Sequence, residues 1–413
     1  MKQTSRDAGA GAASIPEKPA RSKVYHTDMR TRAGLGLLEK LDRLVRRAGI
    51  GDIDFTGRFA AIKIHFGELG NLASLRPNYA RCVAGIVAGL GAKPFLTDCG
   101  TLYAGHRKNA LDHLDCAMKN GFSPMSTGCQ IIIGDGLKGT DEALVPVTGT
   151  EFVSVAKIGR AIMDADIIIS LNHFKGHELT GFGGALKNLG MGCASRAGKM
   201  EQHNSGKPVV RPRLCRKCRA CAKECGQDAI DYGDDGTARI HPGRCAGCGR
   251  CIGTCNFDAI ENPDWNPNEI LCKKMAEYAL AVTQGRPQFH INIATQISPC
   301  CDCHGENDMP FIPDCGMLAS FDPVALDQAT ADICNGQTPI AGGALEQTLK
   351  HGPAPGGECA CGMCHDGGGH DGDAHARHAD HFTTLFPDTN WRATLDHAEK
   401  IGVGTRDYEL MRV

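Results

Sequence analysis

The sequence predicts an α/β protein with a largely parallel sheet that is interrupted by a small cysteine-rich unit. Short apolar runs rich in β-branched residues, such as "CQIIIGDG" and "ADIIISLN", alternate with segments of helical periodicity. The alternation stops at about Arg211, where cysteine, glycine and basic residues take over until about Pro263, and it then resumes. Strands separated by helices are typical of α/β domains with parallel sheets.

The elements before the interruption begin with a helix over residues 32–48 and a strand in "RFAAIKIHF". "PNYARCVAGIVAGLG" and "HRKNALDHLDCAMKNG" predict helices that end at glycine, and "KPFLTDCG" between them predicts a buried strand. After the interruption we expect a helix in "NEILCKKMAEYALAV" and a strand in "QFHINIATQI". "DPVALDQATADICN" predicts a helix with an aspartate N-cap and proline at its first position, and "NWRATLDHAEKIGVG" predicts a closing helix.

These elements divide the chain into six predicted segments. They are a disordered tail (1–23), the first part of the α/β domain (24–208), the cysteine-rich unit (209–263), the second part of the α/β domain (264–350), a His/Cys-rich surface insertion (351–384) and a C-terminal helix and tail (385–413).

The composition disfavours two classes of binding partner. The formal net charge of the 413 residues is only -2, whereas proteins that bind nucleic acids or membrane surfaces need an extended region of positive charge. The 22 cysteines lie in tight clusters, which is typical of metal binding rather than of disulfide frameworks. Because the first residues lack an apolar signal segment and no long apolar run follows, we expect a cytoplasmic protein.

The cysteine-rich unit contains an internal repeat, "CRKCRACAKEC" and "CAGCGRCIGTC", in which both copies have the spacing C-x2-C-x2-C-x3-C. In two-cluster ferredoxins the fourth cysteine of each run ligates the other cluster. The spacing therefore predicts two 4Fe-4S clusters in a ferredoxin-like α+β insertion, one held by Cys215, Cys218, Cys221 and Cys255, the other by Cys245, Cys248, Cys251 and Cys225. Gly226 and Asn256 stand where proline usually follows the fourth cysteine. Zinc ribbons or structural thiols are the alternative.

Such clusters transfer single electrons, which implies a redox partner protein. The rest of the site should lie beyond the carboxyl ends of the parallel strands. Three predicted strand ends carry suitable side chains there, namely Lys63 and His65, Asp98 with Cys99, and Asn172, His173, Lys175 and His177.

The glycine-rich segment 181–203 follows, and it carries Lys187, Lys199 and His203. Glycines permit close backbone approach and the lysines offer positive charge, so we interpret this segment as an anion pocket. Its glycine spacing is not that of a dinucleotide fingerprint.

The chain resembles the domain of unknown function 362 family, in the branch with an inserted two-cluster ferredoxin domain. The resemblance lies in "KIHFGELGN", "FLTDCGTLYAGHRKNALDH", "HFKGHELTGFGGALKNLGMGC", the cysteine repeats, "CCDCHGENDMPFIPDCGMLASFDPVALDQA" and "GVGTRDYEL". It implies an α/β domain interrupted by the ferredoxin unit, with "CDCH" and "DCG" in the body of the fold. The resemblance does not assign a catalytic role to any residue.

Four further cysteines lie close together in "SPCCDCHGENDMPFIPDCG", namely Cys300, Cys301, Cys303 and Cys315. Three interpretations stay open: an additional metal or cluster site, a redox-active thiol pair, and plain buried cysteines. We favour the first interpretation, and the neighbouring aspartates and His304 argue against a purely apolar environment.

The His/Cys-rich insertion holds a second metal candidate, Cys359, Cys361, Cys364 and His365, with histidines nearby. "CGMCH" also matches a haem-attachment pattern, which the expected cytoplasmic location disfavours. An adventitious histidine-rich loop is the alternative.

Together these observations predict an iron-sulfur oxidoreductase that relays electrons through two clusters to or from a small anionic substrate on the α/β domain. Lys63, Lys175, Lys187 and Lys199 would bind its charge, His65 or His177 would handle protons, and Asp98 would complete the site. The alternative is a non-catalytic electron carrier or a metal- and cluster-handling protein. A flavin reductase is a third hypothesis, for which the sequence has no fingerprint.

Overall fold

A computed structural model of the chain describes residues 21–103, 105–203, 207–261, 268–352 and 380–413. Its centre is an eight-stranded sheet in the order β16-β1-β15-β14-β7-β2-β3-β4. The strands are β16 (Tyr408–Arg412), β1 (Ser22–Thr27), β15 (Gly316–Ser320), β14 (Gln288–Ala294), β7 (Ile167–His173), β2 (Phe59–Lys63), β3 (Lys93–Asp98) and β4 (Gln130–Ile133).

The sheet is largely parallel, as the sequence predicts. The pairs β14/β7, β7/β2, β2/β3 and β3/β4 are parallel, as is β1/β16, whereas β15 is antiparallel to both β14 and β1. The chain builds β2, β3 and β4 in one direction and then returns to place β7 on the other side of β2. Strand order therefore reverses between β2 and β7, and such a reversal is where open α/β sheets bind ligands.

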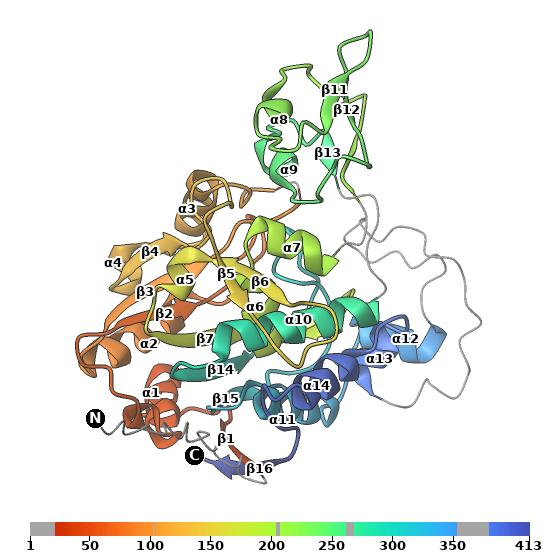
Figure 1. The fold of residues 1–413 in the computed structure, drawn as a ribbon. Coiled ribbons are helices and arrows are strands. Elements are labelled where there is room, and N and C mark those ends of the chain that lie inside the picture. Colours follow the sequence, from red (N-terminus) through yellow and green to blue (C-terminus); the bar gives the residue numbers. More distant parts are fainter. Residues whose placement is uncertain (1–20, 104, 204–206, 262–267, 353–379) are drawn as a thin grey trace, which may run out of the picture.

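Helices cover both faces of the sheet (Figure 1). One face packs α1 (Leu37–Arg47) and α2 (Pro77–Gly89), with α3 (Ala110–Lys119) and α4 (Pro124–Thr127) near its β4 edge. The other packs α6 (Ala185–Cys193), α10 (Asn268–Thr283), α11 (Pro323–Asn335) and α14 (Trp391–Lys400). The remaining helices of the domain are η1 (Ile50–Asp52), α5 (Arg160–Met163), α7 (Arg196–His203), α12 (Ala344–His351) and α13 (His381–Leu385).

Two hairpins accompany the domain, β5 (Glu142–Pro146) with β6 (Val155–Gly159), and β8 (Lys175–His177) with β9 (Gly181–Gly183). Residues 207–261, here called the cysteine-rich insertion, form a separate small unit above α7 (Figure 1). It contains α8 (Ala220–Lys223), α9 (Arg250–Thr254) and the antiparallel pairs β10 (Val209–Val210) with β13 (Ile260–Glu261) and β11 (Ile230–Tyr232) with β12 (Ala238–Ile240).

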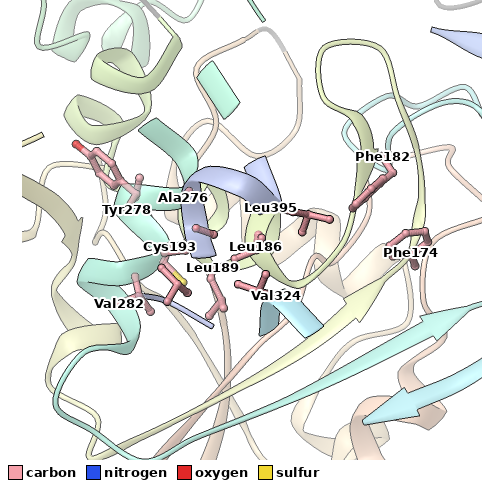
Figure 2. Close-up of a cluster of buried hydrophobic side chains, with 14 of the residues drawn as sticks. Phe174, Phe182, Leu186, Leu189, Cys193, Ala276, Tyr278, Val282, Val324 and Leu395 are labelled. Atoms are coloured by element: carbon pink, nitrogen blue, oxygen red, sulfur yellow. The ribbon is translucent and has the colours of Figure 1, made fainter. Parts of the chain in front are cut away.

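Helix α6 is anchored firmly because its apolar side chains enter the largest core cluster. Figure 2 shows Leu186, Leu189 and Cys193 of α6 among side chains from α10, α11 and α14, including Ala276 and Leu395. Gly190 permits the close crossing of α6 and α10, since a Cβ there would lie 2.1 Å from Met275 O. The intervening positions of α6, Lys187 and Asn188, are thereby fixed at the carboxyl edge of the sheet.

The helices and strands predicted from periodicity are present, and Asp322 caps α11 as predicted by accepting from the N–H groups of Val324 and Ala325. The strand β1 and the edge strand β16 were not predicted. The glycine-rich segment 181–203, interpreted as an anion pocket, contains β9, α6 and α7. The tail 1–20 and most of the His/Cys-rich insertion, including Cys359, Cys361, Cys364 and His365, lie outside the described residues.

Candidate active site

Lys63 and Asp98 come from the ends of the neighbouring strands β2 and β3 and form an ion pair. Lys63 Nζ lies 2.9 Å from Asp98 Oδ1 and donates to Asn188 Oδ1 of α6 at 2.5 Å. Both charged side chains are buried. Burial alone would raise the pKa of Asp98, but the Lys63 ammonium lowers it well below its usual range. His113 Nε2 of α3 lies 3.6 Å from the other carboxylate oxygen.

His65, predicted to share a strand face with Lys63, lies beyond the end of β2 and joins a different network. The Nδ1 of His65 accepts from Gly67 N–H, and its Nε2 lies 2.9 Å from Arg107 Nη1. Burial, reinforced by the Arg107 charge, lowers the pKa of His65 to about 3, so the ring is neutral at pH 7. Arg107 Nε in turn donates to Glu68 Oε2 at 2.9 Å, and this arginine holds the pKa of Glu68 at about 2 despite the opposing effect of burial.

A third network links β7 to the loop after β14. His173 Nδ1 lies 2.8 Å from Asp302 Oδ1, and His173 Nε2 lies 2.7 Å from Thr295 O. Lys175 Nζ approaches the second oxygen of Asp302 at 3.1 Å. Burial opposes ionisation of Asp302, but the adjacent His173 and Lys175 lower its pKa far below the usual range. Asp302 therefore contacts two basic side chains, His173 and Lys175, at the end of β7.

Cys301 and Cys303 form a polarised thiol pair beside this network. The Cys303 S–H donates to Cys301, and this hydrogen bond lowers the pKa of Cys301 and raises that of Cys303. Lys187 Nζ of α6 donates to Cys301 Sγ at 2.9 Å and stabilises the thiolate further. Burial would lower the pKa of Lys187, but the two sulfur atoms raise it above its ordinary value. The pair thus carries one thiolate and one thiol against an ammonium group.

Glu178, Cys303 and His304 form the adjacent group, and one ligand atom from each lies within 4.8 Å of the other two. His304 Nε2 lies 3.3 Å from Glu178 Oε1. The pKa of Glu178 is lowered to about 2, against the effect of burial, by His177 and by the hydrogen bond from His304. His177 itself accepts at Nδ1 from the N–H groups of Leu179 and Thr180.

The cysteines predicted to share a site therefore separate. Cys301 and Cys303 face Lys187, whereas Cys315 enters the apolar core, where Cys334 donates to its sulfur at 3.6 Å. Cys300 is buried. Lys199, predicted to bind an anion with Lys187, donates to Ala194 O at 2.6 Å at the end of α6 instead.

The cysteines of the insertion lie around repeated backbone turns. Cys215, Cys218, Cys221 and Cys255 line one small cavity together. In both runs the residues immediately before and after the second cysteine adopt left-handed conformations, Lys217 and Arg219 around Cys218, and Gly247 and Gly249 around Cys248. The fourth cysteine of each run accepts a hydrogen bond from a backbone N–H, at Ala229 and Ala259 respectively, both at 3.3 Å. The backbone of the two runs is thus turned in the same manner.

The insertion packs on the carboxyl edge of the sheet. Leu102 and Met200 share one apolar cluster with Cys221, Cys251 and Cys255, and Tyr103 packs against it. Lys108 Nζ donates to Cys255 O at 2.7 Å. Tyr103 is also close enough to Cys303 that this thiol, after burial, raises the pKa of its hydroxyl. Tyr103 therefore lies between the cysteine-rich insertion and the Cys301/Cys303 pair.

Sequence reasoning missed Arg107, Glu68, His113 and Glu178, which complete these networks. The first three lie beyond the ends of β2 and β3 in loops or on a helix, where apolar periodicity gives no signal. Glu178 follows directly after the strand that carries Lys175 and His177. Its position beside these two predicted site residues could have identified it from the sequence.

Comparison with known proteins gives one family match. The profile described as Domain of unknown function (DUF362) matches residues 60–332. The comparison with curated proteins yields no match. Within the part of the chain that the structure describes, no helix combines the length and apolarity needed to cross a membrane.

Two solved structures resemble the chain. A protein from Thermotoga maritima has 15% identity and a TM-score of 0.39, over 75% of this chain and 59% of that one. The lactate racemase apoprotein from Thermoanaerobacterium thermosaccharolyticum has 13% identity and a TM-score of 0.34, over 68% and 52% respectively. The chain thus spans little more than half the length of either.

Proposed function

Because the chain belongs to the DUF362 family, whose description names no activity, we propose its function from its own residues. It is an iron-sulfur oxidoreductase of the family branch with a two-cluster ferredoxin insertion. It exchanges electrons with a redox partner protein and with a small anionic substrate bound at the carboxyl edge of the sheet. The observation that carries the proposal is the packing of the cysteine-rich insertion directly on that edge, through Leu102, Tyr103 and Met200.

The cysteines of the insertion fit the clusters predicted for them. The cavity lined by Cys215, Cys218, Cys221 and Cys255 has the crossed composition that two-cluster ferredoxins use, three thiols from one run and the fourth from the other. Backbone N–H groups directed at cysteine sulfur, as at Ala259, are a means by which proteins tune cluster potential. When bound, such clusters supply electrons one at a time.

The basic side chains support binding of an anion. Lys175 and Lys187 converge beside Gly183, because a Cβ at that glycine would lie 3.7 Å from Lys175 Nζ and 3.1 Å from Lys187 Cδ. Lys175 is balanced by Asp302 and Lys187 by Cys301. An incoming carboxylate or oxyanion would meet two ammonium groups in a largely buried setting, where charge interactions are stronger than in water.

His177 suits proton transfer better than His65 does. Since the Nδ1 of His177 accepts from two backbone N–H groups, a neutral ring carries its proton on Nε2, which becomes the donor. His65 is engaged at both ring nitrogens, and its pKa of about 3 leaves the ring unprotonated and weakly basic near pH 7.

The first test is analysis of protein purified without oxygen. We expect about eight iron and about eight sulfide per chain, because two cubane clusters contain that number. Cys218→Ser should remove about half of the iron, whereas Cys334→Ser, which alters a buried thiol of the α/β domain, should leave the iron content unchanged. If the anaerobically purified protein contained no iron, this result would contradict the cluster assignment.

The second test separates an enzyme from an electron carrier. Dithionite-reduced protein is mixed with electron-accepting carboxylates and oxyanions, and reoxidation is followed by visible absorption. If the protein is an enzyme, one class of anion should reoxidise it, and the same anion should reoxidise the Lys187→Gln variant at least tenfold more slowly. Lys350→Gln, at an exposed helix position, is the matched control. Reoxidation by protein acceptors alone, equal in both variants, would establish the alternative carrier function.

A further inference from the structure

We propose that Glu178, Cys303 and His304 bind one divalent metal ion of the zinc class, with a fourth position open toward Lys187. The three side chains offer a carboxylate oxygen, a thiolate sulfur and an imidazole nitrogen, all within 4.8 Å of one another. The bonds of such ions to these ligands are about 2.0 to 2.3 Å long, so an ion placed among the three atoms reaches all of them after a small contraction.

The ligands are held by the backbone before any ion binds. His304 N–H donates to Cys301 O, and His304 O accepts from Asn71 Nδ2 at 3.0 Å. Gly305 packs against Leu69 so closely that a Cβ there would lie 2.7 Å from its carbonyl oxygen. The loop that carries Cys303 and His304 is therefore fixed to the loop after β2, and its geometry does not depend on the metal.

Glu178 is oriented independently. It follows β8, and the two hydrogen bonds from Leu179 and Thr180 to His177 Nδ1 turn the chain immediately after it. The carboxylate then lies 3.3 Å from His304 Nε2. Ligands from two separate segments thus converge, which is a common arrangement in preorganised metal sites.

The chemical nature of the three ligand atoms determines which metal ions fit the site. A thiolate favours Zn²⁺ or Fe²⁺ over Mg²⁺ and Ca²⁺, which prefer oxygen ligands only. Three protein ligands with an open fourth position are typical of catalytic zinc, whereas structural zinc has four protein ligands. The ligand side chains are largely covered, with exposed fractions of 9% for His304 and 18% for Glu178.

The charges also balance. The Cys303 thiolate and the Glu178 carboxylate together neutralise a divalent ion, and the Cys301 thiolate is already neutralised by Lys187 at 2.9 Å. A buried group of zero net charge is far less costly than one with an unpaired ion. Metal binding releases the Cys303 proton, so affinity should rise with pH.

The metal would give the proposed anion a specific contact. An ion with an open position polarises a carboxylate or carbonyl oxygen, and Lys187 lies beside that position to bind the negative charge. This statement about substrate rests on the proposed function, whereas metal binding itself does not.

The test uses the full chain, purified without oxygen and with its iron. A background variant, Cys361→Ser with Cys364→Ser, removes the other metal candidate in the sequence. Zinc is added, excess is removed by gel filtration, and zinc and iron are measured by mass spectrometry. We expect about one zinc per chain, with an X-ray absorption spectrum showing one sulfur near about 2.3 Å and nitrogen or oxygen near about 2.0 Å.

Cys303→Ser and His304→Gln should each lower zinc affinity at least tenfold, with iron content and circular dichroism unchanged. Cys315→Ser is the matched control, since its sulfur lies beside Cys334 in the core, and it should keep the zinc. Zinc retained by both ligand variants, or a shell of sulfur alone, would overturn the inference. One zinc without iron would contradict only the cluster assignment, and eight irons without zinc would contradict only the metal site.

Discussion

The buried ion pair between Lys63 and Asp98 makes a direct prediction for stability. Asp98→Asn removes the carboxylate and leaves the Lys63 ammonium with amide and carbonyl oxygens as partners. Breaking one side of a buried pair typically costs about 3 to 5 kcal/mol, because a charge stays buried without compensation. We expect a loss of about 3 kcal/mol in the free energy of unfolding measured by urea titration.

An exposed pair provides the control for this variant. Asp42 and Arg46 lie four residues apart on α1 with both side chains largely exposed. Exposed pairs of this kind contribute about 0.3 to 0.5 kcal/mol. Equal losses for Asp42→Asn and Asp98→Asn would show that the strand-end pair is not buried as described.

Buried neutral histidines predict loss of stability in mild acid. Burial lowers the pKa of His290 from 6.5 to about 3, because the ring lies between Ser170 Oγ and Gln288 Oε1 without a charged partner. The unfolded chain binds a proton at His290 below pH 6.5 that the folded chain does not bind above about pH 3. Stability should therefore fall as pH decreases from 7 to 5, by up to about 1.4 kcal/mol per pH unit for each such histidine.

The check is the pH dependence of the thermal unfolding midpoint between pH 7 and 5. His290→Gln removes one titrating ring and should flatten this dependence, whatever its effect on stability at pH 7. His241→Gln, at an exposed position in the insertion, should leave the slope as it is in the wild type. An unchanged slope for His290→Gln would contradict the assignment.

At the residue scale, sequence reasoning found side chains that end strands and missed those that complete their networks. Lys63, Asp98 and Lys175 were found because a strand pattern indicates where its carboxyl end lies. Arg107 was missed because its role depends on Glu68 and His65, which reach it through loop conformations that no periodicity describes. Cys301 and Cys315 could not be separated, since their different surroundings arise from tertiary packing.

Among the elements, α6 shows how packing outweighs local propensity. Glycine disfavours helix by about 1 kcal/mol relative to alanine, yet Gly190 and Gly192 lie within α6, and Gly198 lies within α7. Gly190 and Gly198 instead permit close contacts, with a Cβ at Gly198 lying 2.4 Å from Lys157 O. The sequence shows that the segment is rich in glycine. The need for glycine at these two positions arises from contacts with Met275 and Lys157, which lie far away in the sequence.

The same contact gives a prediction for the α6/α10 crossing. In Gly190→Ala the new methyl would lie 2.1 Å from Met275 O, a backbone atom that cannot rotate away, so α6 must shift. Overpacking of this kind costs about 1 to 3 kcal/mol or more. Urea titration should show such a loss.

Gly85→Ala is the matched substitution in α2. No atom lies within 4 Å of a Cβ at that position, so the change should stabilise the protein by about 0.5 to 1 kcal/mol. A Gly190→Ala variant that matches it in stability would show that α6 and α10 do not cross so closely.

For the whole molecule, the sequence predicted that a small unit interrupts the α/β domain but not where that unit packs. Ligand spacing is local, and the repeated cysteine runs therefore reveal the insertion clearly. Its position depends on residues from distant segments, such as Lys108 before α3 and Met200 in α7. The strands β1 and β16 were missed for a related reason, since they pair with each other across nearly the full length of the chain.

The docking of the insertion depends on Arg196, whose buried guanidinium donates to Lys138 O and Lys108 O and packs against Gly253 of α9. In Gly253→Ala the new methyl would collide with the Arg196 guanidinium, so either this side chain leaves its hydrogen bonds to Lys138 O and Lys108 O or the insertion shifts relative to α7. Hydrogen exchange of α7 should increase, and anion-linked reoxidation should slow, with iron content unchanged. Gly226→Ala, where no atom lies within 4 Å, should alter neither property. Faster exchange in both variants would mean that substitution within the insertion, rather than its contact with Arg196, loosens α7.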